Sequence, residues 1–214
     1  GLASALAATT PEERRLGVTS VDLGAGVATI AMFHDGRFLF TDTLPVGGNH
    51  LAYDLSRQLE TPLAQAERIK VLYGTLTEAA SDEQETVTYP LAAEGDPQLY
   101  QTSKAAIRRI LRPRMDVILG LVRERVEASG LAHLCGARIV LTGGASGLVG
   151  LAEVAADRLA APVRIARPAP IGGVPSSVCS PQFSCALGLV AAAGQGGDLG
   201  LAYGRERSVL GPSM

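Results

Sequence analysis

The sequence predicts an α/β fold in which three consecutive strands are followed by alternating helices and strands, with a small α/β lobe inserted among them. Two patterns support this prediction. Three runs rich in β-forming residues lie close together near the start, and in the second half an apolar strand leads through a glycine turn into a helix. Hydrophobic residues make up 47% of the 214 residues and charged residues 19%, which is the balance of a globular chain.

The chain opens with a short segment that we expect to be the remnant of a preceding half or linker, residues 1–16. It starts without a methionine, and residues 2–8 have the composition of the end of a helix. Thr10 and Pro11 then predict a turn.

A three-stranded meander should follow. Its turns are the glycine loop after Asp22 and an Asp35-Gly36 pair that suits a tight hairpin. The strands are expected at residues 17–22, 27–33 and 37–44. After a break at residues 45–49, leucines at helical spacing predict a helix that ends near Leu59.

Residues 61–130 are expected to form the inserted lobe. Thr61 and Pro62 predict a helix start, with Thr61 as N-cap, and Gly74 its end. The polar stretch that follows contains one strand candidate, residues 85–89. Helical periodicity then returns, and we expect Pro113 to divide it into a short helix and a long one, because proline lacks the N–H of a helical hydrogen bond.

The rest of the chain should complete the core. The expected elements are a strand at 138–142, a glycine turn, a helix at 148–160, a strand at 162–166 and a helix at 183–193. The core subdomain therefore comprises residues 17–60 and 131–193, and residues 194–214 are expected to be a flexible tail. Without the insertion, this order of elements is that of one ribonuclease-H-like half of an actin-type ATPase.

Composition excludes several classes of function. The net charge of −2 gives no reason to expect nucleic acid as a partner. The three cysteines have no C-x-x-C spacing and the three histidines are scattered, so a zinc site is not expected. No apolar stretch approaches the ~18 residues that span a bilayer, and the start lacks a signal peptide, so we expect a cytoplasmic protein.

The first glycine loop, VDLGAGVATI, holds Asp22, Gly24 and Gly26 between two strands. A dinucleotide fingerprint is disfavoured, because its glycines open a helix whereas Val27 here begins a strand. The backbone of a hairpin turn can cradle phosphate oxygens, and an Asp at a strand end can hold a magnesium-bound water. A plain hairpin with a solvated Asp is the alternative.

A second loop, LTGGAS, ends a strand and opens a helix, so its glycines allow a ligand to approach the helix N-terminus. A tight turn without a ligand is equally open. A nucleophile elbow at Ser146 is excluded, because that motif requires glycine where the sequence has Leu148.

Two charged groups complete the candidate sites. Glu67 and Lys70 share one helix face and are candidates for ribose and adenine contacts, or form a surface ion pair. Basic residues gather around Pro113 and provide either a dock for an acidic peptide or a solvated helix face. They are Arg108, Arg109, Arg112 and Arg114.

Taken in order, VDLGAGVATIAMFHDGRF, LPVGGNHLAYDLS, TPLAQAERIK, RPRM, RIVLTGGAS and FSCALGLV resemble the carboxyl-terminal half of the bacterial cell-division family FtsA, over about residues 1–193. Members of this family are actin-like proteins that bind ATP with Mg²⁺, link FtsZ filaments to the inner membrane and recruit other divisome proteins. The resemblance implies the same cofactors and partners here, self-association into actin-like polymers when full length, and a place at the cytoplasmic face of the membrane at the division site.

The resemblance also implies roles for individual residues. Asp22, Gly24, Ala25, Gly26 and Val27 correspond to the second phosphate loop, with Asp22 catalytic through a magnesium-bound water. Glu67 and Lys70 correspond to nucleoside contacts, and Gly143, Gly144, Ala145 and Ser146 to the adenosine motif. Arg112 and Arg114 are expected to bind the acidic carboxyl-terminal peptide of FtsZ.

The sequence departs from the family pattern in three places. Ala25 and Val27 stand where many relatives have glycine and threonine. The first half of the family is absent, so we expect weak ATP binding and no hydrolysis by this chain. Residues 203–214 do not match the family's membrane-binding amphipathic helix. Another actin-type ATPase, of the pilus-assembly or chaperone kind, and a peptide-binding remnant without nucleotide are the alternative functions.

Overall fold

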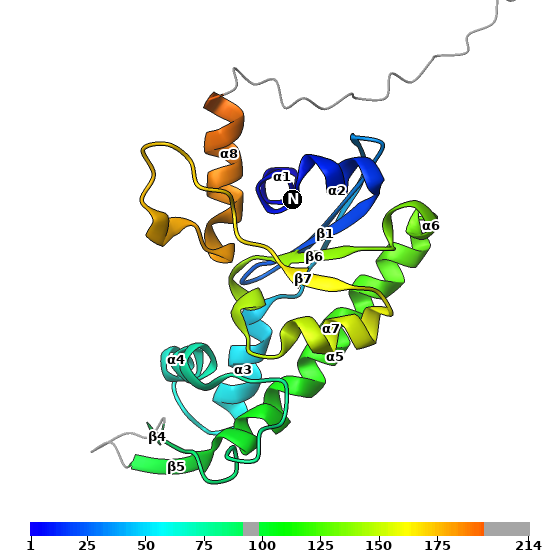
Figure 1. The fold of residues 1–214 in the computed structure, drawn as a ribbon. Helices are drawn as coiled ribbons and strands as arrows, with labels where there is room; N and C mark the ends of the chain where they lie inside the picture. Colours follow the sequence, from blue (N-terminus) through cyan, green and yellow to red (C-terminus); the bar gives the residue numbers. More distant parts are fainter. Residues whose placement is uncertain (92–98, 195–214) are drawn as a thin grey trace, which may run out of the picture.

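The computed structural model describes residues 1–91 and 99–194. Figure 1 shows a twisted sheet with helices on both faces, and below it a smaller lobe that contains α4, β4 and β5. The tail was predicted at 194–214; Gly194 is the last residue of α8 (Ser184–Gly194), and residues 195–214 lie outside the described residues. Among residues 1–91 and 99–194, no helix is both long and apolar enough to cross a bilayer.

The sheet has five strands in the order β3-β2-β1-β6-β7. The first three strands pair antiparallel as the predicted meander, and β1 pairs parallel with β6, which pairs parallel with β7. The strands are β1 (Val18–Leu23), β2 (Ala28–His34), β3 (Arg37–Leu44), β6 (Ile139–Thr142) and β7 (Val163–Ile165). The carboxyl ends of β1 and β6 therefore lie side by side, with Asp22 opposite Thr142.

Alternate side chains of the central strands pack on opposite faces of the sheet. Ile30 and Met32 of β2 belong to the larger buried cluster, whereas Ala31 and Phe33 belong to the smaller one. Figure 1 shows α5 and α7 on the face of the larger cluster, and α1 with α8 on the other. These helices are α1 (Leu2–Ala8), α5 (Lys104–Ala128), α7 (Leu151–Leu159) and α8 (Ser184–Gly194); the short α6 (Ala132–Cys135) contacts β1 and β2.

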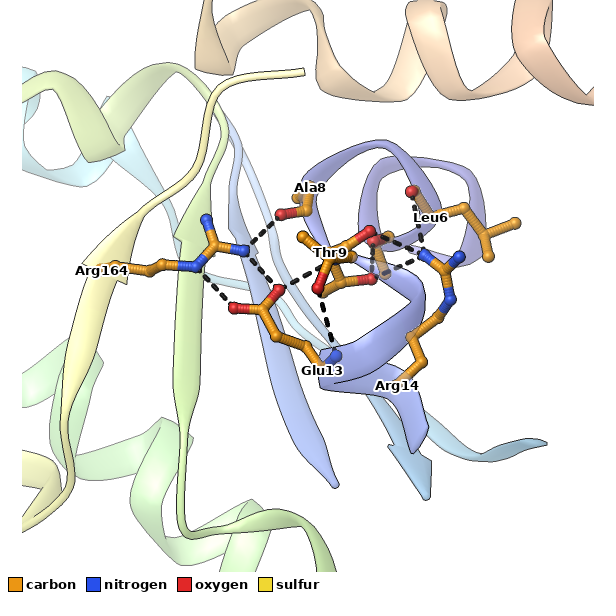
Figure 2. A network of polar contacts seen from close by, with 8 residues as sticks. Leu6, Ala8, Thr9, Glu13, Arg14 and Arg164 are labelled. Atoms are coloured by element: carbon orange, nitrogen blue, oxygen red, sulfur yellow. Dashed lines mark hydrogen bonds and ion pairs between the residues drawn. The ribbon is translucent and has the colours of Figure 1, made fainter. Parts of the chain in front are cut away.

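The segment expected to be a turn after Thr10 is a helix, α2 (Pro11–Leu16). Thr10 and Glu13 form a reciprocal capping box, which satisfies the first backbone N–H groups of the helix. Figure 2 shows how the segment is fixed: Arg164 of β7 binds the Glu13 carboxylate and the Ala8 carbonyl, and Arg14 binds the carbonyls of Leu6 and Thr9. Residues 1–16 are thus packed onto the core.

The lobe contains α4 (Leu63–Tyr73) and a two-stranded sheet, β4 (Thr86–Pro90) with β5 (Leu99–Ser103). The second of these strands was not predicted, because its sequence is short and polar. Pro62, not Thr61, is the N-cap of α4. The Thr61 hydroxyl instead donates to the Pro90 carbonyl at 2.6 Å and ties the helix start to β4.

The predicted break at Pro113 is wrong, because α5 runs through it from Lys104 to Ala128. A proline inside a helix costs ~3 kcal/mol. Its neighbours Leu111 and Met115 are fully buried in the larger cluster, and their burial offsets that cost. The same cluster continues from the lobe into the sheet, so α5 connects the two parts.

The helix predicted at 148–160 begins later than expected. A 3₁₀ turn (Gly144–Gly147) follows β6, and α7 starts at Leu151. The loop after β7 contains two further 3₁₀ turns, Ser176–Val178 and Pro181–Phe183, before α8.

Candidate functional site

The first glycine loop closes as a tight turn, in which the Gly24 N–H donates to the Val27 carbonyl at 2.9 Å. Its outward carbonyls hold the start of α3 (Gly48–Gln58). Gly24 accepts from the Gly48 N–H at 2.9 Å, and Ala25 accepts from the Asn49 N–H at 2.8 Å. A Cβ on Gly47 would lie 2.6 Å from the Gly24 oxygen, so this close approach requires glycine at 47.

The second loop packs directly against the end of β1. Gly143 has φ +86°, and a Cβ there would lie 2.3 Å from Asp22 Oδ1 and 2.5 Å from the Leu23 oxygen. Only glycine permits this contact. The Ser146 hydroxyl is buried and donates to the Gly143 carbonyl at 2.7 Å, so it stabilises the turn itself.

Lys70 reaches this region from α4 and is 7% exposed. Its ammonium donates to the Gly48 carbonyl at 3.0 Å and to Glu67 Oε2 at 2.6 Å. A Cβ on Gly48 would be 3.2 Å from the Ala145 Cβ and 3.3 Å from Lys70 Nζ. The two glycine loops, the start of α3 and the end of α4 therefore meet at Gly48.

These four segments enclose a cavity of about 120 Å³. Its lining residues are Gly24, Ala25, Gly48, Asn49, Glu67, Lys70, Gly144 and Ala145. Other residues that the sequence singled out do not line the cavity: Asp22 in β1, Gly26 and Val27 in the first loop, and Gly143 and Ser146 in the second. Gly48 and Asn49 were missed, although the break at residues 45–49 signals a loop there.

The cavity is lined by glycine backbone and by one ion pair. The ammonium of this pair, Lys70, is buried, whereas its carboxylate partner, Glu67, is 46% exposed. Sites for drug-sized ligands usually enclose at least ~300 Å³, so this cavity has room for only part of such a ligand. In the part of the chain that the structure describes, no three His, Cys, Asp or Glu side chains are placed to hold a metal ion together.

A second cavity, of about 340 Å³, lies between α3 and α5; we call it the α3–α5 groove. Its lining residues are Asp54, Gln58, Arg109, Ile110, Pro113, Arg114 and Val117. Arg114 makes a two-pronged contact with Asp54, from Nε to Oδ2 at 2.6 Å and from Nη2 to Oδ1 at 3.0 Å. The hydrogen bond to Asp54 raises the pKa of Arg114 above its ordinary value, although an arginine is fully charged at neutral pH without this shift.

The arginines predicted as one basic cluster do not share one face of α5. Arg112 lies outside the groove lining, and binds Asp116 at 3.2 Å and the Leu76 carbonyl at 3.1 Å. Residues two apart on a helix do not share a face. Arg109 lines the groove together with Arg114 and contacts Glu83 at 3.1 Å.

Comparison with known proteins places the chain in a family. The family described as "Cell division protein FtsA" matches residues 19–188. Cell division protein FtsA of Agrobacterium fabrum is 42% identical over 189 residues, which cover 88% of this chain and 43% of that protein. FtsA of Escherichia coli K12 is 33% identical over 218 residues, covering 99% of this chain and 49% of that protein.

Solved structures show the same fold. MreB5 of Spiroplasma citri, crystallised with ADP, superposes with a TM-score of 0.70 at 20% identity, covering 90% of this chain and 58% of MreB5. The predicted actin-like fold is thereby confirmed. The chain spans about half the length of the curated relatives it matches. From the match to residues 19–188 and the identity with curated relatives, the chain belongs to the FtsA family of cell-division proteins.

Proposed function

We propose that this chain provides one wall of an ATP site and a docking groove for the acidic carboxyl-terminal peptide of FtsZ, as part of an adaptor that links FtsZ filaments to the membrane. The observation that supports the nucleotide site best is the meeting of both glycine loops with Glu67 and Lys70 around one cavity. The ADP bound to the structurally similar MreB5 is consistent with this proposal.

In the proposed site each group has a distinct task. The turn from Gly24 to Val27 approaches the phosphates, since glycine backbone leaves room for their oxygens. Lys70 and Glu67 contact the nucleoside, while Gly144 and Ala145 provide the surface on which it rests. Mg²⁺, bound with the nucleotide, would neutralise phosphate charge, and Asp22 would orient one of its waters.

Gly144 offers a test that spares the fold. A Cβ at Gly144 meets only the Gln182 Cβ, at 3.8 Å, and Gly144 lines the cavity. Gly147 is in the same turn, has nothing within 4 Å and does not line it. In equilibrium dialysis with labelled ATP and magnesium at millimolar concentration, Gly144→Val should reduce binding at least about tenfold and Gly147→Val should not.

If both variants bind ATP as the wild type does, the nucleotide lies elsewhere and this part of the proposal fails. If wild type binds no ATP at all but binds the FtsZ peptide, the function is that of a peptide-binding module.

The groove between α3 and α5 supports the peptide part of the proposal. It presents Arg109 and Arg114 beside apolar surface from Ile110, Pro113 and Val117. Arginine pairs with carboxylates through charge-assisted hydrogen bonds. An acidic peptide with an apolar side chain therefore matches this surface.

The measurement is calorimetric titration with the carboxyl-terminal FtsZ peptide. Arg114→Glu should abolish binding. Arg123→Glu is the matched control, because Arg123 lies on the same helix, pairs with Glu127 and is 52% exposed outside the groove. Equal binding by both variants would exclude the groove as the docking site.

Self-association into actin-like polymers, contacts with other divisome proteins and a place at the inner membrane belong to the same proposal for the whole protein. Family membership supports them.

A further inference from the structure

The guanidinium of Arg114 already holds a carboxylate of this chain. Asp54 Oδ1 and Oδ2 accept from Nη2 and Nε, the geometry that a bound ligand carboxylate would itself prefer. We propose that Asp54 is an internal competitor in the α3–α5 groove, a residue that lowers the affinity for acidic peptides because a peptide carboxylate must displace it from Arg114. The inference rests on the proposed peptide-docking function.

The pair can open at little cost. The Arg114 side chain is 36% exposed and that of Asp54 is 21% exposed, so water reaches both partners. Ion pairs accessible to solvent contribute little to stability. Both residues also lie on regular helices, α3 and α5, so separation requires only side-chain rotation.

Asp54 opposes an acidic ligand in two ways. It occupies the edge of the Arg114 fork where two parallel hydrogen bonds form. Its negative charge also lies within the same groove, where like charges a few ångströms apart repel. A ligand with one carboxylate exchanges one ion pair for another and gains little.

Arg109 changes this balance for a ligand with two carboxylates. Its side chain is 62% exposed and its partner Glu83 is 65% exposed, so the contact is loose. A second ligand carboxylate can engage Arg109 while the first replaces Asp54 at Arg114. Val117, 52% exposed, and Pro113 contribute apolar surface along the same groove. Asp54 therefore weakens the binding of any acidic peptide, and a second carboxylate at Arg109 together with an apolar residue in the groove offsets that cost.

The test replaces Asp54 with the uncharged isostere. In Asp54→Asn the side-chain amide still accepts one hydrogen bond from Arg114, but the negative charge is gone. We expect the variant to bind the carboxyl-terminal FtsZ peptide about three- to tenfold more tightly than wild type at low salt. The gain should shrink as salt rises, because the effect is electrostatic and screened. A peptide with a single carboxylate should gain by no more than this factor, because the freed Arg114 is common to both peptides and the removed repulsion acts on fewer charges.

Asp116→Asn is the matched control. It removes the same charge from α5, where Asp116 binds Arg112 and Arg158 outside the groove lining. Its peptide affinity should stay within about twofold of wild type. Thermal unfolding of each variant establishes that it is folded.

The outcomes separate this inference from the function it rests on. If wild type binds the peptide, Arg114→Glu abolishes binding and Asp54→Asn binds equally or more weakly, then Asp54 orients Arg114 and the competitor role is refuted while docking stands. If neither wild type nor Asp54→Asn binds, the docking proposal and the inference both fail. Tighter binding by Asp54→Asn, with the affinity of Asp116→Asn unchanged, supports the inference.

Discussion

Replacing Glu13 with glutamine should destabilise the fold. Glu13 is 7% exposed and accepts three hydrogen bonds, from Nε and Nη2 of Arg164 and from the Thr10 N–H. Glutamine presents an NH₂ group in place of one oxygen, so at least one of these donors loses its partner and the Arg164 charge is left unpaired. Through Arg164, this carboxylate and the Ala8 carbonyl join residues 1–16 to β7 (Figure 2).

The size of the expected loss of stability follows from the burial of the Glu13–Arg164 ion pair. Breaking a fully buried ion pair costs ~3–5 kcal/mol. The Arg164 side chain is 40% exposed, so water stabilises the orphaned charge and lowers the cost to about 2 kcal/mol. For a chain of this size that corresponds to a fall in Tm of ~4–8 °C.

The difference between wild type and Glu13→Gln should depend on pH. Hydrogen bonds from Arg164 lower the pKa of Glu13 in the folded state below its ordinary value of 4.5, and the desolvation that opposes them is smaller. A carboxyl group with a lowered folded pKa contributes stability that is fully present above the unfolded pKa. That contribution is lost as pH falls through the folded pKa.

Urea unfolding followed by circular dichroism, at pH 7 and at steps below pH 5, measures both effects. Glu12→Gln is the control, because Glu12 is the adjacent residue of α2 and is exposed. Equal stability of the two variants, or a difference that persists unchanged at acid pH, would refute the reasoning.

Three further predictions concern the loops and α5. Gly143→Ala should lower the free energy of unfolding by at least about 2 kcal/mol, because its Cβ would meet Asp22 and the Leu23 backbone at positive φ. Gly147→Ala, the control in the same turn, should leave that free energy nearly unchanged. Chemical denaturation measures both variants, and equal effects would contradict the packing of the second loop. Pro113→Ala should raise the free energy of unfolding by about 1 kcal/mol, since alanine restores a helical N–H. A lower free energy of unfolding in the same denaturation experiment would mean that Pro113 stabilises α5. The chain alone should show no magnesium-dependent ATP hydrolysis in a phosphate-release assay, and turnover that disappears in Asp22→Ala would overturn that expectation.

Local patterns were sufficient for much of the fold. The meander, both glycine loops and the strand before the second loop were predicted, because strand alternation and glycine turns are encoded within a few residues. The capping box of α2 was also visible, as Thr10 and Glu13 have its spacing, but the prolyl residue between them was interpreted as a turn. The continuous α5 was not predictable locally, since burial of Leu111 and Met115 outweighs the cost of Pro113 only in the tertiary structure.

The candidate site was also predictable only where local sequence patterns determine it. The glycine loops and the Glu67–Lys70 pair were identifiable from sequence. The participation of Gly48 and Asn49 depends on hydrogen bonds to loop carbonyls more than twenty residues away, which local patterns do not contain. The separation of Arg112 from Arg114 follows once the helix is known to be continuous, because residues two apart point in different directions.

A nucleotide site where the two glycine loops meet α3 and α4 is best tested by nuclear magnetic resonance of the isotope-labelled chain titrated with ATP and magnesium. The backbone signals of Gly24–Val27, Gly48–Asn49, Glu67–Lys70 and Gly143–Ala145 should shift together with one dissociation constant. Shifts confined to other parts of the chain, or no shift at millimolar ATP, would contradict it.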